Sequence, residues 1–211
     1  MAMLLVLEHT MRVWNLVSSM KIITREFLKY KFYNSLFLGI SVGSIFTIYT
    51  PLNPSIYSFA GIILALAMLF IAKLYSKILN TYYFFRISLL VELIAFILIA
   101  YFLIFSYSYT TALFVYLGYQ ITFTFGSYLV RAETVILKRA KILTFLDVTK
   151  QKGYLAGMLI SFLFYKLLEY SFGITNNQDL VYYIHYLLLI VEVITIMYIV
   201  KSFTIAVNYK P

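Results

Sequence analysis

The chain has 211 residues, of which 63% are hydrophobic and only 12% are charged. No soluble fold of this length needs so much apolar surface, so the composition excludes a soluble domain and predicts a polytopic membrane protein. The formal net charge of +9 could suggest nucleic acid as a partner. The basic residues, however, occupy short loops between apolar runs, which indicates membrane orientation. We therefore expect a lipid bilayer as the partner and no nucleic acid.

The reactive residue types are scarce. The chain has no cysteine, which excludes disulfides, thiolate metal sites and cysteine nucleophiles. His9 and His185 are far apart and show no ligand-like spacing. An intramembrane enzyme needs a nucleophile and a base, or metal ligands, that converge at depth. We therefore expect no enzyme, no catalytic residue, no metal site and no cofactor.

The apolar runs are continuous and about twenty residues long, which matches a bilayer core of about 30 Å at 1.5 Å per helical residue. Barrel strands would instead alternate polar and apolar side chains over about ten residues. The sequence thus predicts an all-α membrane protein with a six-helix membrane domain at 32–204. The six transmembrane helices are expected at 32–50, 55–74, 87–106, 111–130, 153–170 and 180–200.

Three further segments flank these helices. Residues 1–31 are expected to be a cytoplasmic N-terminal segment. Its apolar residues either form one face of an amphipathic interfacial helix or belong to an extension upstream of a start nearer Met20. A surface helix is expected within the basic stretch 131–152, and 205–211 is expected to be a cytoplasmic tail.

The distribution of basic residues predicts the orientation. The N-terminal segment, the 2–3 loop, the 4–5 loop and the tail hold 16 of the 17 Lys and Arg residues, and the loops on the opposite side hold none. The positive-inside rule then gives six crossings with both termini cytoplasmic. An abundance of Lys, Ile, Tyr, Phe and Asn is typical of an AT-rich bacterial genome, so we expect the cytoplasmic (inner) membrane of a bacterium.

An internal repeat links the third and sixth helices. Residues 82–99 and 182–199 share seven identities over 18 paired positions, including Glu92 with Glu192. Roughly two identities would arise by chance, which favours a repeat over the convergence of two apolar helices, the alternative. Because each copy holds three helices, the second copy must be inverted, as in secondary transporters. We expect two inverted three-helix repeats.

The chain resembles one six-helix half of the major facilitator superfamily. The resemblance rests on helix order, the Pro51–Pro54 turn, the long basic 4–5 loop and the glycine-rich start of the fifth helix at 153–157. In the 2–3 loop, 72–79 keep a leucine and a basic residue but lack the family's acidic residue and glycines. The resemblance implies a half-size secondary transporter for a small-molecule solute. Because the family carries two halves, it also implies a homodimer or a separate six-helix half as partner.

Polar residues of the first and fourth helices are the candidates for the substrate cavity, because these helices line the cavity in the family that the chain resembles. Gln120 is the most informative, since its amide needs partners that lipid cannot provide. We expect Gln120 to face a cavity; ordinary hydrogen bonding between helices is the alternative. The candidates are Asn34, Ser41, Ser44, Tyr116, Tyr119, Gln120 and Thr124.

Glu92 and Glu192 are acidic residues within apolar runs, and such residues indicate function by default. They are interpreted either as proton-coupling groups or as structural carboxylates that are protonated or paired with Arg86, Lys201 or a tyrosine. The chain is accordingly expected to be a half-size transporter acting as a dimer. The alternative is a non-transporting membrane scaffold or assembly subunit built on the same bundle.

Overall fold

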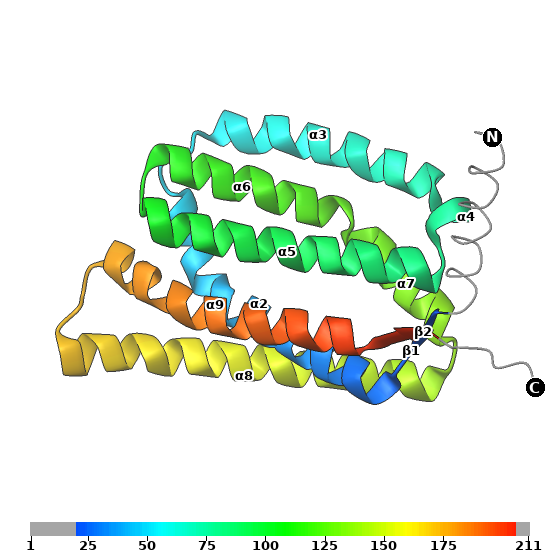
Figure 1. The fold of residues 1–211 in the computed structure, drawn as a ribbon. Helices are drawn as coiled ribbons and strands as arrows, with labels where there is room; N and C mark the ends of the chain where they lie inside the picture. Colours follow the sequence, from blue (N-terminus) through cyan, green and yellow to red (C-terminus); the bar gives the residue numbers. More distant parts are fainter. Residues whose placement is uncertain (1–19, 206–211) are drawn as a thin grey trace, which may run out of the picture.

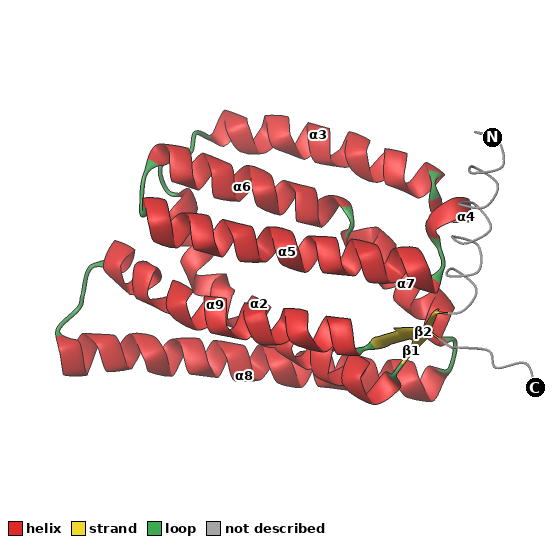
Figure 2. Cartoon of the chain, in the orientation of Figure 1, coloured by secondary structure: helices red, strands yellow, loops and turns green. Residues whose placement is uncertain are grey.

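A computed structural model describes residues 20–205 of the chain. The predicted amphipathic helix lies mostly outside the described residues, as does the tail beyond residue 205. Within the described range the chain is almost entirely helical (Figures 1 and 2). The elements are β1 (Met20–Ile22), α2 (Thr24–Tyr49), α3 (Pro54–Lys73), α4 (Tyr75–Ile78), α5 (Thr81–Phe105), α6 (Tyr109–Thr124), α7 (Gly126–Leu137), α8 (Ala140–Phe172), α9 (Asn177–Lys201) and β2 (Phe203–Ile205).

Six of these helical segments are long and apolar enough to cross a membrane, with α6 and α7 together forming one of them. Their most apolar windows have mean hydropathies from 1.2 to 2.7. This confirms the predicted class, a multi-pass all-α membrane protein, and each predicted helix has its counterpart. A short polar side chain of the preceding residue caps the start of four helices, α3, α5, α6 and α9. For α5 the cap is Asn80, whose Oδ1 accepts a hydrogen bond from the Tyr83 backbone amide at 3.0 Å.

The first transmembrane helix starts earlier than predicted. Helix α2 begins at Thr24 rather than at residue 32, so the basic stretch at 24–31 is helical. Phe27 and Tyr30 of this stretch are 1% and 2% exposed and pack in a cluster with Phe84, Tyr128 and the residues around them. Burial of these two aromatic rings explains why the helix extends into residues that the prediction placed in the cytoplasmic N-terminal segment.

The stretch 131–152 also differs from the prediction, because two helices divide it. Helix α7 ends at Leu137, Lys138 turns the chain with a φ of 53°, and α8 then runs without a break for 33 residues. Leu146, in the early part of α8, is fully buried in the same cluster as Tyr128 and Ala132. The first turns of α8 therefore pack back against α7 instead of forming a separate surface helix.

The helices form two groups that meet through α5 and α9. Helix α2 packs against α8 and α9, and α6 packs against α3 and α5 (Figure 1). Helices α5 and α9 pack against each other and run in opposite directions. Helix α3 is at the edge of the bundle, where only Ala60 of its residues is buried.

The contact between α2 and α8 is a close approach of two backbones. A Cβ placed on Gly157 would lie 3.0 Å from the Gly39 Cα and closer still to the Leu36 carbonyl oxygen. A Cβ on Gly153 would meet the Phe32 carbonyl oxygen in the same way. Small residues at this spacing allow membrane helices to approach closely. Gly39 of α2 and the glycine-rich start of α8 therefore lie against each other, whereas a Cβ on Gly43 would make only an ordinary contact with the Tyr165 ring.

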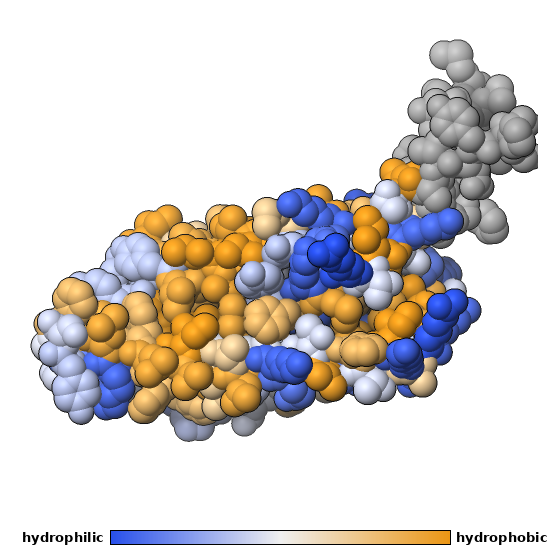
Figure 3. Space-filling view, turned by 90° about the horizontal axis from the view of Figure 1, so that it is seen from below, coloured by the Kyte–Doolittle hydropathy of each residue, from blue (hydrophilic) through white to orange (hydrophobic). Residues whose placement is uncertain are grey.

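The two ends of the described chain lie at the same end of the bundle. β1 pairs antiparallel with β2, with Met20 opposite Ile205 and Ile22 opposite Phe203. The loops at the far end, at 50–53, 106–108 and 173–176, contain no Lys or Arg. The surface follows this division: hydrophobic side chains cover most of the face in Figure 3, and many of the hydrophilic ones gather toward the end that carries the strands.

Candidate functional site: a buried carboxyl pair

Two acidic side chains meet in the interior of the bundle. Glu92 of α5 is 3% exposed and Glu192 of α9 is fully buried. Their carboxyl groups lie within hydrogen-bonding reach of each other. Because α5 and α9 are antiparallel, residues at matching positions of the two repeat segments can meet at one level of the bundle. The pair that the sequence analysis singled out is therefore one site rather than two.

Helix α2 supplies donors to Glu92. The Tyr30 hydroxyl donates to Glu92 Oε1 at 2.6 Å, and Asn34 Nδ2 donates to the same oxygen at 3.0 Å. Tyr30 and Asn34 are four residues apart, so they share one face of the helix. Of the partners considered for the carboxylates, a tyrosine is thus present, whereas Arg86 is engaged elsewhere and donates to the Tyr82 hydroxyl at 2.8 Å.

Glu192 differs from Glu92 in its surroundings. Apart from the carboxyl group of Glu92, neither of its oxygens has a hydrogen-bond partner among residues 20–205. A carboxylate can only accept hydrogen bonds, so two ionised carboxylates cannot bond to each other. A hydrogen bond between Glu92 and Glu192 therefore requires a proton on one of them.

A second buried charge cluster lies next to this pair. Lys31 of α2 and Lys150 of α8 both pair with Glu133 of α7, Lys31 through an Nζ–Oε2 distance of 2.8 Å. Glu133 is 4% exposed and Lys31 7% exposed. Lys31 also lies close enough to Glu92 to attract it electrostatically. The sequence analysis placed Lys31 in the N-terminal segment and Glu133 and Lys150 in the stretch of the expected surface helix, so it did not predict that these residues meet.

The predicted cavity residues of α2 do not share a cavity. Asn34 belongs to the Glu92 site. Ser41 and Ser44 are buried, and their hydroxyls donate to carbonyl oxygens of their own helix, at 3.0 Å to Leu38 and 2.7 Å to Ser41. Such bonds satisfy the hydroxyls locally, so both serines serve helix packing in this structure.

The predicted residues of α6 point to two places. The Tyr116 ring packs edge-on against Tyr49 and Tyr57 at centroid distances of 5.2 and 5.1 Å. Gln120 and Thr124 line a hollow of about 360 Å³ between α3 and α6, whose other lining residues are apolar. Tyr119, half-buried, lies near Glu192. Gln120 thus does border a hollow, but an apolar one on the flank of the bundle.

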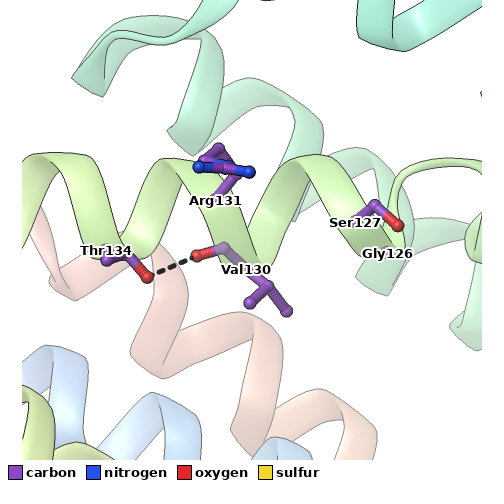
Figure 4. A pocket seen from close by; sticks show the side chains of 5 residues that line it. All are labelled: Gly126, Ser127, Val130, Arg131 and Thr134. Carbon is purple, nitrogen blue, oxygen red and sulfur yellow. Dashed lines mark hydrogen bonds between the residues drawn. The ribbon is translucent and has the colours of Figure 1, made fainter.

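A larger open hollow runs along α7. It has a volume of about 540 Å³ and is lined by Gly126, Ser127, Val130, Arg131 and Thr134 (Figure 4). These residues lie along the helix, and the Thr134 hydroxyl donates to the Val130 carbonyl oxygen at 3.0 Å. With one cation and no second group of complementary chemistry from another element, this surface offers no converging set of reactive groups.

Within the part of the chain that the structure describes, no group of three or more His, Cys, Asp or Glu side chains is arranged to hold a metal ion. The carboxyl pair is therefore the most unusual chemical feature of the described residues. Comparison with protein-family models, with curated proteins and with solved structures gave no match for this chain.

Proposed function

We propose that this protein is a half-size secondary transporter that moves a small solute across a bacterial cytoplasmic membrane as a dimer, with both termini cytoplasmic. The proposal includes two inverted three-helix repeats, α2–α3–α5 and α6–α8–α9, arranged like one half of a major facilitator superfamily protein. Inverted repeats occur in many secondary transporters, and in the major facilitator superfamily a 3+3 pair of them is nested within each six-helix half; the two halves, here two copies of the chain, are the parts that move against each other.

The observation that supports the proposal is the pattern of helix contacts. In the proposed repeats α2 corresponds to α6, α3 to α8 and α5 to α9. The contact of α2 with α8 then corresponds to that of α6 with α3, and the contact of α2 with α9 to that of α6 with α5. The remaining major contact, between α5 and α9, is exchanged with itself. Each exchanged pair also runs in opposite directions (Figure 1). The proposed repeats place a pseudo-twofold axis between α5 and α9, and such an axis accounts for this pattern and for the meeting of Glu92 with Glu192.

Single cysteines test the proposal, because the chain has none of its own. A transport path must bring water to membrane depth, so Gln120→Cys should react with a membrane-impermeant maleimide in proteoliposomes. Leu66→Cys, on the exposed face of α3, is the matched control because lipid should shield it. Equal protection of both cysteines, under every solute and pH gradient applied, would contradict a path along α6. The mass of the particle in nanodiscs reports separately whether two copies associate.

A second candidate, a non-transporting scaffold, is favoured by a different observation. The polar residues of α2 and α6 are divided among the Glu92 site, local backbone bonds and an apolar hollow, instead of lining one polar cavity. The two exchanged helices α3 and α8 also pack differently, since a Cβ added at Gly61 of α3 would meet nothing within 4 Å, whereas one added at Gly157 of α8 would clash with the backbone of α2. A scaffold predicts that Gln120→Cys stays unreactive while the protein remains folded and associated.

A further inference from the structure

We propose that Glu92 and Glu192 form a buried site that holds a single proton, shared between α5 and α9. The site goes beyond the proposed transport function, because it follows from the packing of three helices whether or not a solute moves. The proton comes from water, forms one O–H bond on one carboxyl group, and leaves the other carboxyl group as the charged acceptor. No electron transfer and no other reactant is involved.

The geometry of donors and acceptors requires this proton. Glu92 Oε1 already accepts from Tyr30 and Asn34, which favours the ionised form of Glu92. Glu192 has no such donors among the described residues and is fully buried beside Glu92. The proton is therefore expected on Glu192, which donates it to Glu92. Two ionised carboxylates at this position would repel each other without water to screen them.

The same geometry disfavours a metal cation in place of the proton. The Tyr30 hydroxyl and the Asn34 amide both direct hydrogens at Glu92, and such donors would repel a cation bound there. A metal ion would also need several more oxygen ligands than two carboxyl groups provide. A proton needs neither additional ligands nor empty space.

The charges of the buried groups balance with one proton bound. The pair then carries one negative charge and Glu133 a second, opposite the two positive charges of Lys31 and Lys150. Asp147, which lies 3.4 Å from Lys150, has a side chain that is 72% exposed, so solvent screens its charge. Loss of the proton would add an uncompensated negative charge in an apolar interior, which is strongly unfavourable. A second proton would remove the charge that faces Lys31. The titratable or charged groups that bear on the pair are Tyr30 and Lys31 of α2, Tyr119 of α6, and Glu133 of α7 with its partner Lys150 of α8, which also pairs with Asp147 of α8.

Infrared spectroscopy of the protein in liposomes at neutral pH tests the proposal directly. The carbonyl absorption of a protonated carboxylic acid is separate from that of a carboxylate, and it shifts when the sample is exchanged into D₂O. We expect one such band in the wild type. The double variant Glu92→Gln/Glu192→Gln should lose it, while the amide groups preserve the size of both side chains and still allow them to hydrogen-bond to each other. Absence of the band in wild type, or its persistence in the double variant, would overturn the proposal.

Two single variants complete the test. In Glu192→Gln, the new amide can donate to Glu92, so the fold should remain and the band should vanish. A band of half the wild-type area would mean that both carboxyl groups are protonated in the wild type, which would overturn the single-proton site. Glu169→Gln is the matched control and should leave the band unchanged. Glu169 does not belong to the site, because its carboxylate pairs with Lys166 at an Nζ–Oε2 distance of 2.6 Å. If the double variant fails to fold by circular dichroism, the Glu192→Gln spectrum alone decides.

Discussion

The close approach of α2 and α8 leads to a quantitative prediction for Gly157→Ala. The added Cβ would lie 3.0 Å from the Gly39 Cα and the Ile40 nitrogen, and closer to the Leu36 carbonyl oxygen. All three are backbone atoms, which cannot rotate away as a side chain can, so the helices must separate. Overpacking of this kind typically costs about 1–3 kcal/mol.

Gly61→Ala is the matched control for this substitution. Gly61 also lies within a transmembrane helix, but a Cβ there would meet nothing within 4 Å. Both substitutions gain the same helix propensity, so their difference isolates the clash. We expect Gly157→Ala to be less stable than Gly61→Ala by about 1–3 kcal/mol, roughly a five- to 150-fold difference in the ratio of folded to unfolded protein.

The measurement is reversible unfolding in mixed detergent and SDS micelles, followed by circular dichroism for both variants and wild type. If Gly157→Ala is as stable as Gly61→Ala, the two backbones do not pack as closely as the structure describes. A loss of stability in Gly61→Ala instead would place a neighbour, such as a second copy of the chain, against α3.

Two further predictions concern the buried polar groups, and both are checked by the same unfolding measurement. Tyr30→Phe removes the hydroxyl that donates to Glu92 and should lower stability by about 1.5–3 kcal/mol, the range for hydrogen bonds to charged groups; an unchanged stability would show that another donor replaces it. Glu133→Gln leaves Lys31 and Lys150 without their shared anion and should cost about 3–5 kcal/mol, as expected for a broken buried pair; a loss below about 1 kcal/mol would mean that water solvates these lysines.

The transmembrane segments were accessible from the sequence because their signal is local. Each is a continuous apolar run, and the structure places a helix on every predicted one. The boundaries were less accessible, since tertiary burial extends α2 back through Phe27 and extends α8 back through Leu146. β1 and β2 have three residues each, too few for any periodic pattern to appear.

The candidate site could be predicted only in part. Glu92 and Glu192 stood out because acidic residues are rare within apolar runs. Their partners did not, because Tyr30 is 62 residues from Glu92 in the chain and is one of 21 tyrosines. Lys31 looked like any other basic residue at the edge of a membrane helix. Its burial beside Glu133 depends on tertiary packing that brings α2 and α7, about 100 residues apart in the chain, to the same place, which no local sequence pattern specifies.

The polar contacts of α2, α5 and α9 also imply an order of assembly in the cell. When α5 is synthesised, Tyr30 and Asn34 of α2 already exist, so Glu92 can enter the bilayer with donors waiting for it. Glu192 and the strand partner of Met20–Ile22 are made last. The insertion of α9 is thus the step that completes both the carboxyl pair in the interior and the pairing of β1 with β2 at one end of the bundle. A chain that ended before residue 177 would have five spans, and Glu92 would lack the carboxyl group of Glu192 as its partner. We expect such an incompletely packed intermediate to be recognised by membrane quality control.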